Sequence, residues 1–206
     1  MKFGVITFPG SNCDMDMIYA LETIMKQEVE HLWHKDKDLK GCDFIIIPGG
    51  FSYGDYLRSG AIARFSPIME KVIEHARNGG YVMGICNGFQ ILCEAGLLPG
   101  ALLHNNQHKF ICKNITLVPV SESATLTKHL SENKTYTIPI AHGEGRFYAS
   151  NKVLKELEAN DQILFKYASN EGEINEEANP NGSEMNIAGN CNKNKNVFGM
   201  MPHPER

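Results

Sequence analysis

The sequence lacks several patterns that would place a protein in a specialised class. No run of apolar residues approaches the roughly 20 that a bilayer-spanning helix needs, although 42% of the 206 residues are hydrophobic. The formal net charge is only −4, so the charge balance favours neither a nucleic acid nor an anionic membrane as a partner. Internal repeats are also missing. We therefore expect a single globular domain over residues 1–206, with no nucleic acid and no membrane as partner.

The six cysteines include no Cys-x-x-Cys pair, and the N-terminus has neither the length nor the cleavage pattern of a signal peptide. Reduced thiols in the cytoplasm are therefore a better interpretation than a disulfide framework. His104 and His108 are four residues apart, but no helical pattern and no acidic ligand accompanies them. We expect no metal site in this chain.

The first half of the chain alternates between strand and helix patterns. Strands are predicted at 3–8, 29–33, 43–48 and 81–85, and helices from near Asp14, over 68–77 and over 89–94. Ser11 or Asn12 is expected to cap the first of these helices, and its apolar positions are Met17, Ile18, Leu21, Ile24 and Met25. Such alternation predicts an α/β fold with an open, mostly parallel sheet flanked by helices. Ligands of such sheets lie beyond the carboxyl ends of the strands.

The second half has a different texture, and we see no domain boundary before it. Strands are predicted at 110–120, 136–141, 163–169, 185–189 and 197–201, and a helix near 153–159. An Asn/Glu-rich stretch at 170–182 is expected to be a loop with mostly solvated side chains.

The most informative motif is Gly-Ile-Cys-Asn-Gly-Phe-Gln at residues 84–90, directly after the apolar run 81–83. It predicts a strand that stops at Cys86, turns on glycines and becomes a helix. The free N–H groups of such a helix carry roughly half a positive charge, which favours the thiolate. A cysteine in a turn is otherwise commonly a small buried hydrophobe. The Gly-x-Cys-x-Gly spacing favours a nucleophile, with the Asn87 N–H free to face an oxyanion.

A second glycine-rich loop, at residues 48–55, follows another predicted strand. It has neither the Gly-Lys-Ser/Thr ending of a phosphate loop nor the Gly-x-Gly-x-x-Gly pattern of dinucleotide sites. We expect a backbone donor there, from Gly50 or the adjoining peptide, to complete an oxyanion hole with Asn87. An ordinary turn at the end of a strand is the alternative.

The end of the chain, Met-Pro-His-Pro-Glu at 201–205, offers the base that a cysteine nucleophile needs. Residues two apart in an extended segment lie on the same side of the backbone, so His203 and Glu205 point together. The flanking prolines exclude a helix. We expect Glu205 to orient the imidazole and His203 to face Cys86. A solvated pair at the terminus is the alternative.

These motifs together resemble the class I glutamine amidotransferases, with Cys86, His203 and Glu205 as a Cys-His-Glu triad. Further stretches look like the glutaminase subunits of phosphoribosylformylglycinamidine synthase, a purine-biosynthesis enzyme; they are 8–14, 49–58, 141–147 and 179–183. The resemblance spans nearly the whole chain. It implies the flavodoxin-like architecture of the class I amidotransferases.

The resemblance also implies a reaction, in which Cys86 attacks the side-chain amide of L-glutamine, a γ-glutamyl thioester forms, and His203 protonates the departing ammonia. By similarity, Gln90, His142 and Gly143 help to hold the glutamine; helix packing and a plain turn are the alternatives. The ammonia would pass to a large ATP-dependent synthetase subunit, which converts formylglycinamide ribonucleotide to formylglycinamidine ribonucleotide. A third small subunit is a further expected partner. ATP and Mg²⁺ are expected on the synthetase partner, and no cofactor is expected on this chain.

The sequence departs from the family pattern in two places. The pattern usually continues beyond the His-Pro-Glu-Arg stretch, whereas this sequence stops at Arg206, and relatives often carry cysteine where Ser59 stands. Two other protein classes fit the motifs less well. Cysteine hydrolases of the protease I type resemble one another in an acidic residue near the cysteine and lack the terminal His-x-Glu pair. A non-catalytic binding subunit would be expected to have lost the cysteine or the histidine, and both are present.

Overall fold

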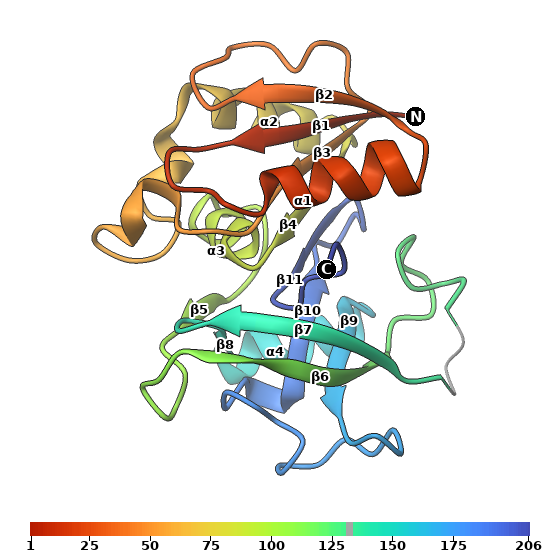
Figure 1. Cartoon of the computed structure of the whole chain (residues 1–206). Helices are drawn as coiled ribbons and strands as arrows, with labels where there is room; N and C mark the ends of the chain where they lie inside the picture. Colours follow the sequence, from red (N-terminus) through yellow and green to blue (C-terminus); the bar gives the residue numbers. More distant parts are fainter. Residues whose placement is uncertain (131–133) are drawn as a thin grey trace. The chain divides into compact units, whose positions relative to one another are not determined.

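The computed structural model describes residues 1–130 and 134–206, which form two compact units (Figure 1). The first unit comprises Met1–Leu97 together with Glu205, and the second comprises Leu98–Pro204 together with Arg206. The expectation of one domain over residues 1–206 stays a prediction. Across the described parts of the chain, no helix has the length and apolarity that crossing a membrane requires.

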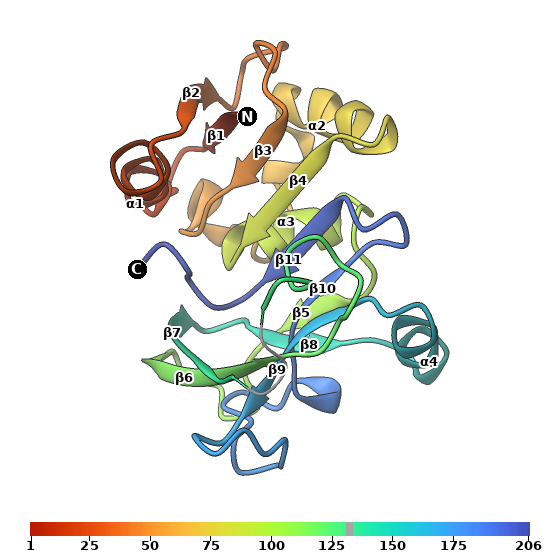
Figure 2. The same ribbon diagram turned by 90° about the vertical axis from the view of Figure 1, so that its right-hand side faces the viewer.

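The first unit is a parallel sheet with helices on both faces. Its elements are β1 (Lys2–Thr7), α1 (Asp14–Tyr19), η1 (Ala20–Ile24), β2 (Glu28–Trp33), β3 (Phe44–Ile47), η2 (Ser52–Asp55), η3 (Ala63–Phe65), α2 (Pro67–Arg77), β4 (Tyr81–Ile85) and α3 (Asn87–Glu94). The strand order is β2-β1-β3-β4, and all three pairings are parallel. Helix α1 covers one face, and α2 and α3 cover the other (Figure 2). This confirms the predicted α/β class and is the order of a flavodoxin-like sheet.

Local sequence explains the main elements of this unit. Strand β3 is apolar throughout because both of its faces are covered, and Ile45 and Ile47 have no exposed surface. Helix α2 begins with Pro67 at its first position, where a missing N–H costs no hydrogen bond. Its buried side chains follow a helical period and form its contact with the sheet; they are Ile68, Met69, Val72 and Ala76.

Two expectations about the first helix are wrong. Cys13, not Ser11 or Asn12, precedes α1, and no side chain caps the helix. The Ser11 hydroxyl instead bonds the backbone N–H and C=O of Phe8. Ile24 and Met25 were expected on the buried face but are exposed. Ile24 ends the π-helical turn η1 and Met25 follows it, and the wider i→i+5 spacing of this turn rotates these side chains away from the sheet.

The second unit is mainly an antiparallel sheet. Its elements are β5 (Ala101–Leu103), β6 (Ile111–Pro119), β7 (Tyr136–His142), β8 (Arg146–Tyr148), α4 (Asn151–Ala159), β9 (Ile163–Ala168), η4 (Glu184–Asn186), β10 (Ile187–Cys191) and β11 (Val197–Met200). The strand order is β11-β10-β9-β6-β7, and every pairing is antiparallel. Strands β5 and β8 form a separate antiparallel pair that the sequence did not predict. The expectation of antiparallel strands in the second half is confirmed.

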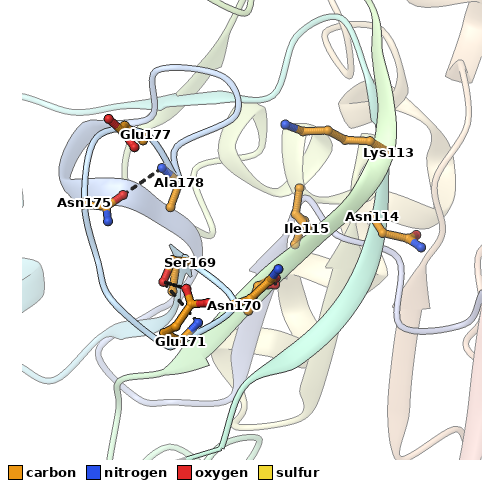
Figure 3. A pocket seen from close by; sticks show the side chains of 11 residues that line it. Lys113, Asn114, Ile115, Ser169, Asn170, Glu171, Asn175, Glu177 and Ala178 are labelled. Carbon is orange, nitrogen blue, oxygen red and sulfur yellow. Dashed lines mark hydrogen bonds between the residues drawn. The ribbon is translucent and has the colours of Figure 1, made fainter.

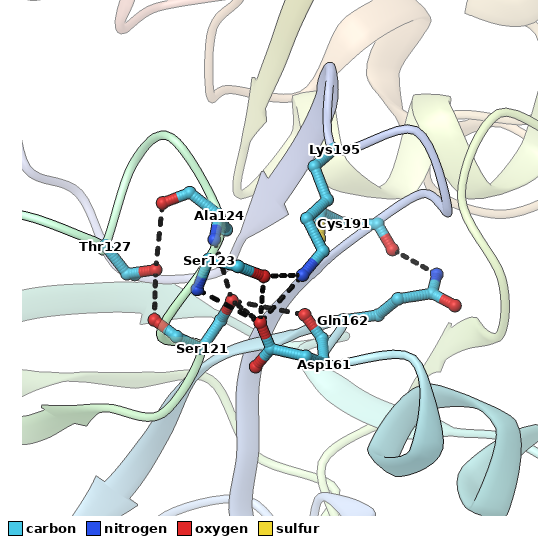
Figure 4. Close-up of polar contacts among 8 residues, drawn as sticks. All are labelled: Ser121, Ser123, Ala124, Thr127, Asp161, Gln162, Cys191 and Lys195. Atoms are coloured by element: carbon cyan, nitrogen blue, oxygen red, sulfur yellow. Dashed lines mark hydrogen bonds and ion pairs between the residues drawn. The ribbon is translucent and has the colours of Figure 1, made fainter.

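A polar cluster joins three distant segments of the second unit (Figure 4). The Asp161 carboxylate accepts hydrogen bonds from both the hydroxyl and the backbone N–H of Ser123, from the hydroxyl of Ser121, and from Nζ of Lys195 at 2.7 Å. Although burial opposes it, these hydrogen bonds hold the pKa of Asp161 well below its ordinary value. We name this set the Asp161 latch, because it fixes the 121–124 turn to the β10–β11 hairpin.

Candidate active site

Cys86 occupies a strained elbow between β4 and α3. Its backbone has φ 51° and ψ −106°, a conformation that residues other than glycine rarely adopt. A nucleophile at such a strand-to-helix turn is held in a sharp, strained conformation that presents its side chain to a substrate. The structure therefore confirms the predicted turn, while the catalytic role of Cys86 stays a proposal.

Two glycines allow α3 to lie directly against the sheet. A Cβ atom on Gly88 would lie 1.9 Å from the carbonyl oxygen of Ile47, and one on Gly84 would lie 2.4 Å from the carbonyl oxygen of Gly88. Both obstacles are backbone atoms, which cannot move aside as a flexible side chain does. The two glycines of the Gly-x-Cys-x-Gly motif therefore allow the start of α3 to pack on β3 and β4.

The charge state of Cys86 differs from the sequence expectation. Burial is the largest effect and raises the pKa of the thiol to about 12, with further increases from Cys13, Glu205 and Asp55. The Asn87 N–H hydrogen-bonds the sulfur and acts in the opposite direction, as expected of a helix N-terminus. Desolvation outweighs it, because Cys86 is only 5% exposed. The expected preference for thiolate is wrong for these surroundings.

The Gly50 loop lies against the segment that follows β1. Gly50 pairs with Ser11 in an isolated antiparallel bridge, and the bridge bond runs from the Phe51 N–H to the Gly10 carbonyl at 3.0 Å. In such a pair the bonds come from the flanking residues, so the N–H of Gly50 itself points away from the bridge. A Cβ on Gly50 would lie 2.6 Å from the backbone nitrogen of Asn12, which excludes any side chain.

The Asn87 side chain has partners that sequence reasoning missed. Its Oδ1 accepts from the Ser52 N–H at 3.1 Å, and its Nδ2 donates to Gln90 at 2.9 Å and to Asp55 at 3.3 Å. From the sequence we expected only the backbone N–H of Asn87 to have a role, as an oxyanion donor. An amide next to the candidate nucleophile was the available signal, but the partners of this amide lie up to 35 residues away in sequence.

Glu205 belongs to the first unit. One of its carboxylate oxygens lies within 4.8 Å of the sulfur of Cys13, and its charge raises the pKa of Cys86. Cys13, at the start of α1, was not predicted as a site residue. The first unit therefore contains Cys86, Asn87, Gly50, Gln90 and Glu205.

The second unit holds the two predicted histidines. The His203 backbone N–H donates to the carbonyl of Pro139 on β7 at 2.9 Å, and His142 ends the same strand. Both side chains are buried. Burial, followed by the nearby His203, lowers the pKa of His142 to about 4, so this imidazole is neutral at pH 7.

Asn105 sets the protonation pattern of His142. Its Nδ2 donates to the carbonyls of Lys109 and His142, so its Oδ1 is the acceptor for Nδ1 of His142 at 3.1 Å. The proton of the neutral ring therefore sits on Nδ1. Nε2 is then a buried acceptor that has no hydrogen-bond partner within the described part of the chain. The backbone N–H of Asn105 also donates a hydrogen bond to the carbonyl oxygen of Gly143 at 2.9 Å, which fixes Gly143 in place.

The Asn-Pro-Asn-Gly-Ser stretch at 179–183 supports the same loop. The Oδ1 of Asn179 accepts hydrogen bonds from the backbone N–H groups of Asn181, Gly182 and Ser183. Asn181 is fully buried and donates to the carbonyl of Gly145, and Ser183 accepts from the N–H of Phe147. The 179–183 stretch therefore holds the 142–148 segment in place through these hydrogen bonds.

Other polar features of the second unit contain none of the predicted site residues. A pocket of about 340 Å³ lies between β6 and the 169–178 loop, with Lys113, Asn170, Asn175 and Glu177 among its lining residues (Figure 3). Near β5, Nδ1 of His104 lies 3.6 Å from a carboxylate oxygen of Glu144. An acidic neighbour for this histidine was not evident from the sequence.

Comparison with known proteins shows several similar chains. The profile of the CobB/CobQ-like glutamine amidotransferase domain matches residues 1–206. Phosphoribosylformylglycinamidine synthase subunit PurQ from Moorella thermoacetica is 58% identical over 206 residues, which are 100% of this chain and 87% of the relative. The PurQ subunit from Salinibacter ruber is 54% identical over 205 residues, with the same coverage of 100% and 87%.

Solved structures give the same result. A chain in the structure of PurLQS from Thermotoga maritima matches with a TM-score of 0.87 and 42% identity, over 100% of this chain and 88% of that chain. A glutamine amidotransferase from Thermotoga maritima matches with a TM-score of 0.61 at 13% identity, over 100% of this chain and 76% of that chain. The second match shows a shared fold alone.

Proposed function

Since the chain belongs to the CobB/CobQ-like glutamine amidotransferases and, within them, to the PurQ subunits of phosphoribosylformylglycinamidine synthase, we propose that Cys86, His203 and Glu205 are the triad with which it hydrolyses L-glutamine. The glutamate would be released and the ammonia passed to a synthetase subunit. The strained elbow at Cys86, with the Asn87 N–H on its sulfur, is the observation that carries the assignment.

In the proposed mechanism, His203 takes the proton of the Cys86 thiol, and Glu205 orients the imidazole. The sulfur attacks the carbonyl carbon of the glutamine side chain. The N–H groups of Gly50 and Asn87 stabilise the oxyanion, and His203 returns the proton to the departing ammonia. Water then hydrolyses the γ-glutamyl thioester. The raised pKa of the Cys86 thiol supports a mechanism with an obligatory base.

Substrate contacts form the second part of the proposal. Gln90, on the same helix as the nucleophile, and the His142–Gly143 turn would hold the glutamine. His142 offers a neutral ring whose Nε2 accepts hydrogen bonds, which suits a donor such as an α-ammonium or an amide N–H. Gly143 is fixed by Asn105, so the turn is preorganised for binding.

The relatives support the proposed partners. The name PurLQS on the solved structure fits an assembly of this chain with a large synthetase subunit and a third small subunit. ATP and Mg²⁺ would bind the synthetase subunit, where formylglycinamide ribonucleotide is converted to the amidine. We place the chain in the cytoplasm, where purine-biosynthesis subunits act.

Replacing the nucleophile tests this function directly. We expect Cys86→Ala to lower glutamine-dependent synthesis by the complex by on the order of a thousandfold or more, because no other group would form the thioester. Synthesis fed with free ammonia should survive, because the synthetase subunit is untouched. The wild-type chain alone should release glutamate slowly, and its complex much faster.

Cys93→Ala is the matched control. Cys93 lies on α3, the helix that begins directly after Cys86, and it is outside the proposed site. It should keep glutamine-dependent synthesis. Retention of that synthesis in Cys86→Ala would show that another group is the nucleophile. Loss of both glutamine- and ammonia-dependent synthesis would point to an assembly defect instead.

A further inference from the structure

The side chain of Asn87 is placed to connect the nucleophile elbow with the Gly50 loop. It is 1% exposed and directly follows Cys86. The Ser52 N–H can only donate, so the atom of Asn87 that faces it is the carbonyl oxygen. The amide nitrogen then faces two acceptors, Asp55 and Gln90. Both ends of one amide are used, which fixes its orientation.

The segment that Asn87 holds is strained. Tyr53 and Asp55 have φ of 54° and 53°, and Gly54 between them has 67°. Left-handed backbone is unfavourable for residues other than glycine, so the segment keeps this shape only while its surroundings hold it. One support lies at Tyr53, whose hydroxyl is 2.6 Å from Nδ1 of the buried His34. Asn87 provides the support on the side of the nucleophile.

Ser52 shows why this second support matters. It is 2% exposed, and its hydroxyl has no hydrogen-bond partner among the residues that the structure describes. The backbone bond to Asn87 is therefore the polar contact that fixes Ser52 to the elbow. Gly50 lies two residues earlier in the same loop. Ser52 connects this loop to the elbow, and Phe51 connects it to the segment after β1 through the Gly10 carbonyl.

We propose that the Asn87 side chain is a positioning residue that holds the 50–55 loop, and with it the oxyanion donor at Gly50, in register with Cys86. The inference rests on the proposed function, because it takes Cys86 as the nucleophile. The backbone of Asn87 donates to the sulfur, and its side chain aligns the second donor. One residue thus sets the geometry of both halves of the oxyanion hole.

Asn87→Ala tests the inference, because it removes the side-chain bonds and keeps the backbone N–H. Loss of an oxyanion donor typically lowers kcat by about 10²–10³-fold. A donor that is displaced and not deleted should cost roughly 10- to 100-fold in glutaminase kcat. We expect the KM for glutamine to change less than kcat, since the loop acts on the transition state. The assay uses the complex with the synthetase subunit.

Asn87→Asp separates a positioning role from a general loss of packing. Its carboxylate can accept from the Ser52 N–H but repels Asp55, whereas its protonated form can both accept and donate. We expect kcat of this variant, divided by kcat of Asn87→Ala at the same pH, to fall as the pH rises from 5.5 to 8. A ratio independent of pH would overturn the inference, because lost packing alone does not titrate.

Asn192→Ala is the matched control. Its Oδ1 also accepts two backbone N–H bonds, from Asn196 and Val197, in a turn outside the site, and its kcat should be unchanged. Wild-type kcat in Asn87→Ala would overturn the inference, as would an increase in KM alone, which would indicate an effect through Gln90. If Cys86→Ala is inactive in the same assay, either result leaves the proposed function standing.

Discussion

His142 combines nearly complete burial with a fixed hydrogen-bond partner. Asn105 holds its Nδ1–H, and burial and His203 lower its pKa to about 4. The unfolded chain has an ordinary histidine pKa near 6.5. Between about pH 6.5 and 4, the unfolded state therefore binds a proton that the folded state does not. Stability must then fall as the pH falls through this window.

This linkage gives a prediction at the scale of one residue. We expect His142 to contribute a loss of up to about 3 kcal/mol in the free energy of unfolding between pH 6.5 and 4. His142→Gln should remove this component, so its stability should depend less steeply on pH. Urea titrations at a series of pH values measure the slopes. The exposed His129→Gln is the control, and equal slopes for wild type and His142→Gln would contradict the prediction.

Single residues also show where sequence reasoning stops. The elbow at Cys86 was predictable, because the glycines, the cysteine and the preceding apolar run are adjacent in the chain. The roles of the Asn87 and Asn105 side chains were not, since their partners lie up to 40 residues away in sequence. The pKa of Cys86 also escaped prediction, because burial is a property of the folded environment.

At the scale of elements, the contact between α3 and the sheet depends on Gly88. We expect Gly88→Ala to destabilise the protein by about 3 kcal/mol or more and to abolish glutaminase activity, because a Cβ would meet a backbone carbonyl 1.9 Å away. Chemical denaturation and glutamate release measure the two effects.

Gly96→Ala is the control for backbone strain. Gly96 follows the end of the same helix with φ 69°, and no atom lies within 4 Å of the position that a Cβ would occupy there. Only the left-handed conformation is then penalised, at roughly 1–2 kcal/mol. Similar losses in both variants would mean that the contact with Ile47 is not the cause.

Element boundaries were predictable where the pattern is long. Strands of four or more residues in the first half appear at the predicted places, because runs such as 44–47 are apolar throughout. Strands β5 and β8 were missed, since three residues carry no readable period. The strand predicted at 185–189 begins only at Ile187, because Met185 adopts φ 54° in a preceding turn.

At the scale of the whole molecule, tertiary contacts outweigh local pattern. The Asp161 latch joins residues separated by up to 72 positions, and nothing in the sequence marks its members as partners. The division into two compact units was not predicted either, because the sequence marks no boundary between them although its second half has a different texture. Assembly of the triad from Cys86, His203 and Glu205 stays a prediction, carried by the motifs and by the family.

The latch provides a prediction about global stability. The lowered pKa of Asp161 means that its contribution is present above the unfolded value of about 3.9 and is lost as the pH falls below it. We expect Asp161→Asn to lower the free energy of unfolding at pH 7 by about 1 kcal/mol, a small value because the side chain is 37% exposed. The difference should begin to shrink as the pH falls below about 3.9 and should disappear only below the lowered pKa of the folded carboxyl.

Thermal or urea unfolding of the two proteins across this range measures the effect. Glu158→Gln, an exposed change on the neighbouring helix α4, is the control and should leave stability unchanged. A loss for Asp161→Asn that stays constant from pH 7 down to the lowest pH at which the wild type remains folded would show that the carboxylate charge is not what stabilises the latch.

The raised pKa of the Cys86 thiol also bears on how fast this residue is oxidised. Peroxides and alkylating metabolites attack the thiolate form of cysteine far faster than the thiol. The desolvated surroundings that raise the pKa of Cys86 would therefore also slow its oxidation. With Cys86 as the proposed nucleophile, the thiol would become reactive only when a base removes its proton, and burial would protect it from oxidation until then.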